Sequence, residues 1–266
     1  MPEQSQRLPV VFIGHGTPMN TLADNRYTEA WRKLGAALPR PKAVLVISAH
    51  WYVGESAVTA MPRPKTIHDF YGFPPPLFAF QYPAAGDPQL ATRVQQLLAP
   101  IAVRRDENWG LDHGAWSVLA HLLPSAEVPV VELSMDGRQP ATFHYELGRK
   151  LAPLRDEGVL ILASGNIVHN LGMMERSDAA QAFPWAMQFN NAARGSLLRK
   201  DHAALLNPMS LDTGARLAIP TPEHYLPLLY AIGAQSDDDA VEVLVDGIDL
   251  ASISMLSVVI GSMPPR

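Results

Sequence analysis

Short runs of apolar residues, rich in Val and Ile, alternate along the chain with longer stretches in which apolar residues recur at helical spacing. The short runs are typical of buried β-strands, and the longer stretches are typical of amphipathic helices. The predicted strands are Pro9–Ile13, Ala43–Ser48, Val128–Leu133, Val159–Ala163, Val241–Val245 and Ser254–Ile260. The predicted helices are Asp24–Leu38, Asp87–Leu98, Gly114–Leu122, Ala141–Leu154, Phe183–Arg199 and Thr221–Ile232.

This alternation predicts an α/β fold in which a mixed sheet, with parallel strand pairs, is covered by helices on both faces. The sequence shows no internal repeat, low-complexity tract or interdomain linker. We therefore expect residues 1–266 to form a single domain. In sheets of this kind, ligands bind beyond the carboxyl ends of the strands.

One segment departs from the pattern. Between Met61 and Pro88, seven prolines are interleaved with six aromatic residues. Proline lacks a backbone donor and resists regular structure, so the segment is predicted to be a long loop, and its aromatic residues indicate that the loop is ordered. Such a loop is either a lid or pocket wall, or a loop that packs on the core, and the sequence leaves both interpretations open.

Composition narrows the functional class. The formal net charge is −5 and no Lys/Arg run occurs, which argues against a nucleic-acid partner. The absence of cysteine excludes disulfides and thiolate metal ligands and is compatible with a reducing compartment. The N-terminal residues lack a signal-peptide core, and no apolar run reaches the ~20 residues of a membrane helix. We expect a soluble cytoplasmic protein with no membrane partner.

Histidines lie where the predicted strands end. His15 and His50 follow apolar strands closely, and His169 follows the strand Val159–Ala163 after a short turn. Neutral imidazole is the commonest metal ligand in proteins, and the topology is expected to bring these rings to one edge of the sheet. One histidine in this position is more often structural, but two in the same chain favour a metal site.

Other histidines have weaker or different settings. His113 and His169 lie in turns that contain glycine or asparagine, where either could act as a general acid or base, with Asp112 and Asn166 to orient them. The remaining histidines are expected to be structural: His68, which opens the aromatic loop, His121, His144 and His202. The sequence has no phosphate-binding loop. It also has no serine nucleophile elbow, which argues against serine hydrolysis.

Six motifs occur in order across nearly the whole chain: Gly14-His15-Gly16-Thr17-Pro18, Ser48-Ala49-His50-Trp51, Asp69-Phe70-Tyr71-Gly72-Phe73-Pro74, Gly110-Leu111-Asp112-His113-Gly114-Ala115-Trp116, Ser164-Gly165-Asn166-Ile167-Val168-His169-Asn170 and Thr221-Pro222-Glu223-His224-Tyr225-Leu226-Pro227. Together they resemble the class III extradiol ring-cleavage dioxygenases, specifically the subgroup of DOPA 4,5-dioxygenase-like enzymes.

The resemblance implies a single catalytic domain that opens a catechol ring with O2 at a non-haem Fe(II) ion, the catechol being DOPA-like or another with a side chain. It also implies the roles of five residues. His15, His50 and His224 are the metal ligands, and His169 lies beside the metal as acid/base and becomes a fourth ligand when no substrate is bound. His113 is the second active-site histidine.

This chain differs in the third ligand from the better-known members of this family, which use two histidines and a glutamate. Here Glu223 directly precedes His224. Adjacent residues on a regular helix point about 100° apart, so both are not expected to bind one ion, and His224 is the ligand we expect. Three neutral imidazoles also suit Zn(II), which is expected to occupy the same site in purified protein.

Two other functions are compatible with the same residues. A zinc-dependent hydrolase would use a metal-bound water as its nucleophile. A binding protein without enzymatic activity would retain the fold alone. The complete set of histidines favours the dioxygenase, whose partners would be a small catechol and O2.

Overall fold

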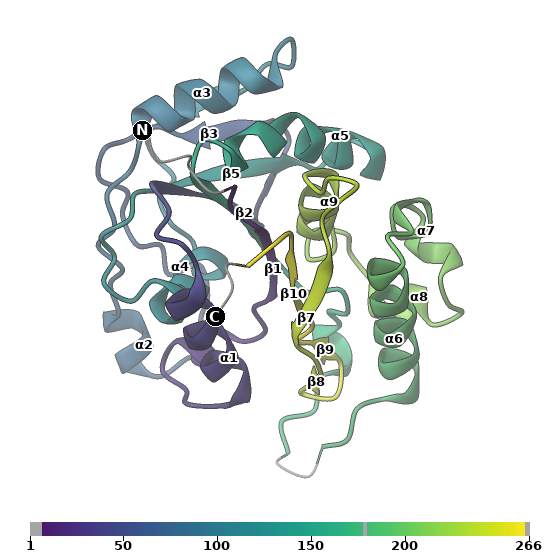
Figure 1. Ribbon diagram of the computed structural model, residues 1–266. Coiled ribbons are helices and arrows are strands. Elements are labelled where there is room, and N and C mark those ends of the chain that lie inside the picture. Colours follow the sequence, from purple (N-terminus) through teal and green to yellow (C-terminus); the bar gives the residue numbers. More distant parts are fainter. Residues whose placement is uncertain (1–6, 178–179, 264–266) are drawn as a thin grey trace.

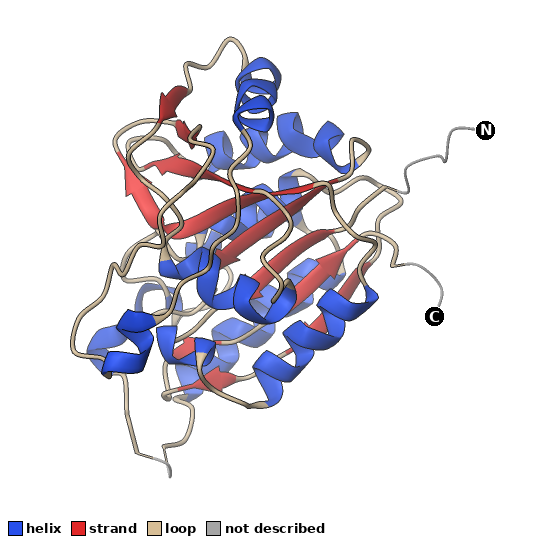
Figure 2. Ribbon diagram, turned by 90° about the vertical axis from the view of Figure 1, so that its left-hand side faces the viewer, coloured by secondary structure: helices blue, strands red, loops and turns tan. Residues whose placement is uncertain are grey.

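The computed structural model describes residues 7–177 and 180–263, and within them an eight-stranded mixed sheet forms the centre of the molecule (Figures 1 and 2). Four central strands are parallel, in the order β5 (Val130–Asp136), β2 (Ala43–Val53), β6 (Val159–Gly165) and β1 (Val10–Gly14). Beyond β1, β10 (Ser257–Ile260) is antiparallel to β1, and β7 (Val241–Val245) is antiparallel to β10. Beyond β5 lie β3 (Ala57–Thr59), antiparallel to β5, and β4 (Arg104–Asp106), parallel to β3.

Helices cover both faces of this sheet, as Figure 2 shows. Alternate residues of a strand point to opposite faces, so in β2 Leu45 and Ile47 enter one core while Val44 and Val46 enter the other. The first core is closed by α3 (Pro88–Leu98), α5 (Ala141–Leu151), α6 (Pro184–Leu198) and α9 (Leu226–Gly233). The second core is closed by α1 (Arg26–Ala37) and α4 (His113–Leu122).

The remaining elements are short. The helices are η1 (Pro18–Thr21), α2 (Pro75–Ala79), η2 (Ala152–Arg155), η3 (Leu171–Met173), α7 (His202–Leu206), η4 (Pro208–Ser210) and α8 (Ala215–Ala218). A two-stranded sheet pairs β8 (Ile248–Asp249) with β9 (Ile253–Ser254). Among the described residues, no helix is both long enough and apolar enough to span a membrane.

The predicted fold class is confirmed, and each predicted strand is present. Val241–Val245 has the predicted ends, and the others differ at one or both ends. β2 runs on to Val53, so His50 lies within the strand and does not follow it. The segment predicted as Ser254–Ile260 is divided between β9 and β10, because the backbone between them turns so that the carbonyl of Leu256 accepts from the amide of Gly14. The strands β3 and β4 were not predicted, since three residues carry too little periodicity.

One predicted helix begins in the wrong place. Residues 221–225 form a turn, and α9 begins only at Leu226. Pro227 has no N–H to offer the carbonyl of Glu223, which lies four residues before it. The carbonyl of His224 accepts from the amide of Asn166, at 2.8 Å, and is thereby held toward β6. The expectation that Glu223 and His224 are neighbours on a regular helix is therefore wrong.

The proline-rich segment 61–88 is a loop, interrupted only by α2. Leu77 and Tyr82 are buried, and Phe70 packs against the second core. Tyr71, in contrast, is 92% exposed. The segment thus packs on the core over part of its length, and through Phe70 it also reaches the histidines described below.

The contact between α5 and α9 is so close that two residues, Gly148 and Gly233, must be glycine. A Cβ atom at Gly148 would lie 2.4 Å from the carbonyl oxygen of Tyr230 in α9.

We expect Gly148→Ala to lower the free energy of unfolding by about 1–3 kcal/mol, because the two helices must separate. The control is Gly195→Ala in α6, where a Cβ would meet only the end of the Arg199 side chain at 3.1 Å. That change is expected to raise stability by up to about 1 kcal/mol through helix propensity. Urea unfolding followed by circular dichroism measures both, and equal effects would contradict the packing argument.

Candidate active site

Five histidines from separate parts of the chain converge at one edge of the sheet. Three of them form a nearly equilateral triangle: the ring centroids of His15 and His50 are 5.1 Å apart, those of His15 and His224 5.4 Å, and those of His50 and His224 5.1 Å. The ring of His113 lies 3.8 Å from that of His50, and the ring of His169 stacks on that of His224 at 3.4 Å. The convergence expected from the topology is therefore present.

The backbone explains how these residues meet. His15 follows β1, His50 lies near the end of β2, and His169 follows β6, so three parallel strands carry them to the same edge. His113 is the first residue of α4, and Asp112 caps this helix by accepting from the amide of Ala115. Such a cap satisfies a donor that the first turn of a helix leaves unpaired.

The protonation of His15 follows from its partner. The hydroxyl of Ser164 donates to the carbonyl of Gly114 at 2.6 Å, so toward the imidazole it is an acceptor. The Nδ1 atom of His15 lies 3.0 Å from this hydroxyl and must carry the proton that it accepts. The Nε2 atom of His15 is left with a free lone pair.

His224 is oriented in the same way by Glu223. A Glu223 oxygen accepts from Nδ1 of His224 at 3.1 Å and from the hydroxyl of Thr221 at 2.7 Å. Burial raises the pKa of Glu223, but these hydrogen bonds outweigh it and lower the pKa to about 2, so the group is a carboxylate. The Nε2 atom of His224 is buried and has no hydrogen-bond partner. Buried polar atoms without a partner are rare, and this one has the lone pair that a metal ion requires.

A second carboxylate that faces histidines, Asp69, lies between His50 and His113. One Asp69 oxygen accepts from Nδ1 of His113 at 2.9 Å and lies 3.4 Å from Nδ1 of His50, and the other oxygen accepts from the backbone amide of His113 at 3.0 Å. Burial raises the pKa of Asp69, but the hydrogen bonds from His113 reverse this and lower it. Sequence reasoning gave Asp69 no role. The only signal was its place in the Asp69-Phe70-Tyr71 motif.

These groups fit a metal ion. The Nε2 atoms of His15 and His50 are 3.2 Å apart, which is the separation of two nitrogens about 2.1 Å from one ion with an angle of about 100° between them. Burial is the main cause that lowers the pKa of His15, His50 and His224, so the three rings are neutral. Neutral imidazoles with a hydrogen-bonded Nδ1 are the usual form of histidine ligands.

Two compact groups of potential ligand atoms are present among the described residues, each with its atoms within 4.8 Å of one another. One is His15, His50 and His113, and the other is His169, Glu223 and His224. The ligand set expected from the sequence thus draws on both groups. His113 lies as close to the first two histidines as a ligand would, although its Nδ1 is engaged by Asp69.

The other polar residues singled out in the sequence have local partners. Asn166 does not orient His169. Its side chain donates to the carbonyl of Ser254 at 2.7 Å. The remaining histidines also contact nearby groups: His68 the carbonyl of Phe80, His121 the carbonyl of Asn20, His144 the hydroxyl of Tyr230, and His202 the side chain of Gln235.

Two acidic side chains, Asp112 and Glu132, are fully buried beneath the histidines. The oxygens of Glu132 accept from the amide of Asp112 at 2.9 Å and from the indole of Trp109 at 3.1 Å. Asp112 accepts from the hydroxyl of Ser48 at 2.6 Å. Burial raises the pKa of Glu132 well above its usual range, and the neighbouring Asp112 raises it further. The pair therefore holds a proton, because two buried like charges this close cannot both ionise.

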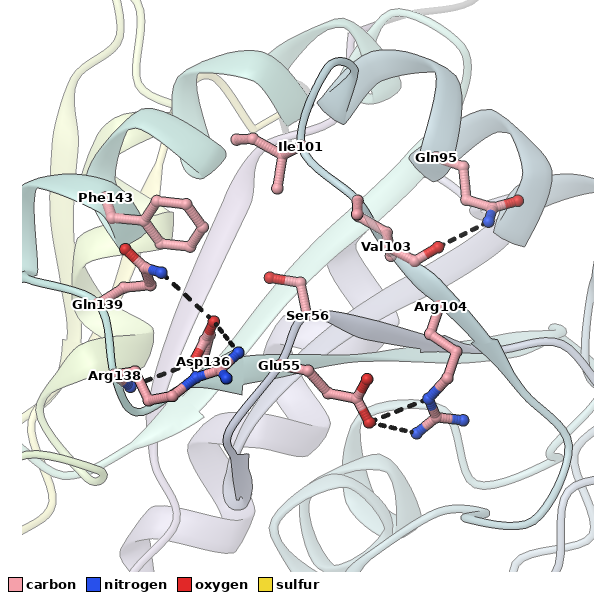
Figure 3. Close-up of a pocket in the computed structure, with 11 residues that line it drawn as sticks. Glu55, Ser56, Gln95, Ile101, Val103, Arg104, Asp136, Arg138, Gln139 and Phe143 are labelled. Atoms are coloured by element: carbon pink, nitrogen blue, oxygen red, sulfur yellow. Dashed lines mark hydrogen bonds and ion pairs between the residues drawn. The ribbon is translucent and has the colours of Figure 1, made fainter.

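A separate cavity of about 630 Å³ lies outside the histidine cluster, between α3, α5 and the turn after β2 (Figure 3). Its charged groups are paired with one another: Arg104 with Glu55, and Arg138 with Asp136. None of the five clustered histidines lines it.

A mixed α/β sheet thus gathers neutral imidazoles and carboxylates at its strand ends, in groups that could hold a metal ion. Residues 9–261 match the family described as the catalytic LigB subunit of aromatic ring-opening dioxygenase, and the chain belongs to this family. It is accordingly an extradiol dioxygenase, as its relatives are.

Two relatives carry the same name. The chain is 50% identical to 4,5-DOPA dioxygenase extradiol of Escherichia coli (strain K12), over 97% of this chain and 96% of the relative. It is 40% identical to 4,5-DOPA dioxygenase extradiol of Beta vulgaris, over 88% of this chain and 89% of the relative. A crystal structure of an uncharacterized protein from Escherichia coli K12 superimposes with a TM-score of 0.85 at 46% identity, covering 96% of this chain and 100% of the other.

The buried acid pair generates a prediction about pH. Glu132 is protonated in the folded state but ionised in the unfolded chain above about pH 5, so folding takes up a proton and stability falls as the pH rises. Glu132→Gln removes this titration. The stability of the variant minus that of the wild type is expected to increase between about pH 5 and pH 7, by at most about 1.4 kcal/mol per pH unit. Thermal unfolding across this range measures the difference. A constant difference would show that Glu132 is ionised in the folded protein.

Proposed function

We propose that residues 1–266 form a single catalytic domain that holds Fe(II) and opens the ring of a side-chain catechol, such as DOPA, with O2. The observation that supports this most strongly is the triangle of His15, His50 and His224. The Nδ1 atom of each ring faces a polar side chain, and the Nε2 atom of His224 is buried without a hydrogen-bond partner. The names of the relatives support the choice of a catechol amino acid as substrate.

In this proposal His15, His50 and His224 hold the metal. The bound ion would supply chelation of both catechol oxygens and activation of O2. Three neutral imidazoles leave the full +2 charge of the ion uncompensated by its ligands, which favours loss of the catechol protons. The same nitrogen-rich set binds Zn(II) well, so purified protein is expected to contain redox-inactive zinc.

His169 is the residue that accepts a proton from the substrate. Its ring stacks on that of His224, which places it directly beside the metal triangle. Burial, together with His224, lowers the pKa of His169 to about 2, so the imidazole is neutral. After the ring bond next to the diol has opened, the same residue returns the proton to the semialdehyde product.

His113 and Phe70 hold the substrate on the opposite side. The ring of Phe70 meets that of His113 edge to face, with centroids 5.5 Å apart and planes at 82°. Phe70 thus forms an apolar wall for an aromatic ring, and the Nε2 atom of His113 accepts a hydrogen bond from a hydroxyl of the substrate. This assigns the aromatic loop a role as pocket wall.

Metal exchange tests the proposed cofactor. The protein as purified is expected to show little activity, and anaerobic reloading with Fe(II) is expected to produce a yellow ring-opened product with uptake of one O2 per catechol. Oxygen-electrode and absorbance assays across a panel of catechols measure this. The matched control is protein reloaded with Zn(II). Full activity with zinc, or hydrolysis of esters or amides in place of oxygen uptake, would contradict the proposal and favour a zinc hydrolase.

Substitution of single histidines separates ligands from the acid/base. His15→Ala is expected to lose the bound metal, because only two imidazoles remain to hold it. His169→Ala is expected to retain the metal and to lose turnover by about 10²–10⁴-fold, the usual contribution of a general acid/base. His202→Ala is the control, since that ring contacts Gln235 far from the cluster. Metal analysis together with kcat measures the set. Equal metal loss in His15→Ala and His169→Ala would make His169 a required ligand.

A further inference from the structure

The aromatic loop is attached to the histidine cluster by the side chain of Asp69. This side chain is 18% exposed, and the loop that carries it runs over residues 61–88 between β3 and α3. Both carboxylate oxygens are engaged by the same residue, one by the backbone amide of His113 and the other by its Nδ1. Two bonds to one residue, at two points of its structure, restrict both the position of the ring and its rotation.

We propose that Asp69 is a positioning residue that keeps the proton of His113 on Nδ1, so that Nε2 remains a hydrogen-bond acceptor for the substrate. The role of His113 in this inference depends on the proposed function. A carboxylate can only accept a hydrogen bond, so an imidazole that faces it must present N–H on that side. In a neutral ring the other nitrogen then has the lone pair.

The Asp69 oxygen that accepts from Nδ1 of His113 also faces the triangle of His15, His50 and His224. It lies 3.4 Å from Nδ1 of His50, whose Nε2 atom is 3.2 Å from that of His15. Asp69 thus favours the Nδ1–H form in a proposed substrate-binding ring and in a proposed ligand ring at once. The other two ligand rings are oriented by different groups, Ser164 and Glu223, so Asp69 is the orienting carboxylate that belongs to the loop.

The residue after Asp69 explains why this attachment affects the substrate. Phe70 packs against His113 and also against Phe73 and Phe78, at centroid distances of 5.5, 5.2 and 5.0 Å. The apolar wall and the hydrogen-bonding ring are therefore positioned by one anchor. A shift of the loop would displace Phe70 and release the tautomer of His113 together.

The substitution Asp69→Asn tests the inference, because it conserves the volume of the side chain but offers an amide N–H to Nδ1. The expected result is a change of His113 to the Nε2–H tautomer. It is observed by ¹⁵N NMR of histidine-labelled protein loaded with zinc, with His113→Gln used to assign the signals. In the Fe(II) enzyme, kcat is expected to fall by about 100-fold or more, with a smaller change in KM, since an incorrect tautomer disables an otherwise intact site.

Asp87→Asn is the matched control. Asp87, like Asp69, accepts from backbone N–H at a helix N-terminus, here the amides of Gln89 and Leu90, and asparagine caps helices equally well. This variant is expected to leave the spectrum and kcat unchanged. The thermal midpoint of Asp69→Asn, measured in parallel, tests whether this variant is folded.

A His113 ring that keeps its proton on Nδ1 in Asp69→Asn would overturn the inference, as would a kcat within about threefold of the wild type. Absence of ring cleavage in the wild-type enzyme would instead overturn the proposed function, and the NMR result would still decide the tautomer.

Discussion

The hydrogen bonds at Nδ1 of His15, His113 and His224 are the interactions on which the site depends. A buried neutral imidazole has one donor and one acceptor, and a fixed acceptor at Nδ1 decides which nitrogen keeps its lone pair. Ser164 from β6, Glu223 from the turn before α9, and Asp69 from the aromatic loop supply these acceptors for His15, His224 and His113. Without them the rings could exchange tautomers, and the Nε2 atoms would not converge as acceptors.

The parallel centre of the sheet makes this arrangement possible. β1, β6 and β2 are adjacent and parallel, so the residues at their carboxyl ends meet without any long insertion. The register pairs Ile13 with Ser164 and Ser48 with Ser164, which places the Ser164 hydroxyl among the histidines of both neighbouring strands. The same three strands bury apolar side chains on both faces, so the site is carried by strands at the centre of the two cores.

The groups around the metal triangle differ in their attachment. Ser164 belongs to β6 and His15 directly follows β1, whereas Asp69 and Phe70 belong to a loop that packs on the core only in part. An enzyme built in this way can keep the strands that carry its histidines constant while the loop shapes the space for the substrate.

The sequence by itself determined the fold class, the central strands, the family and which histidines converge, because each depends on local periodicity or on motifs contiguous in the chain. The tertiary structure alone decided the partners of those histidines. Asp69 lies 44 residues from His113, and no spacing rule connects them. The tertiary structure also decided that residues 221–225 form a turn, since the carbonyl of His224 accepts a hydrogen bond from the amide of Asn166 in a distant segment. Hydrogen bonds between remote segments depend on packing, which the pattern of a single sequence does not specify.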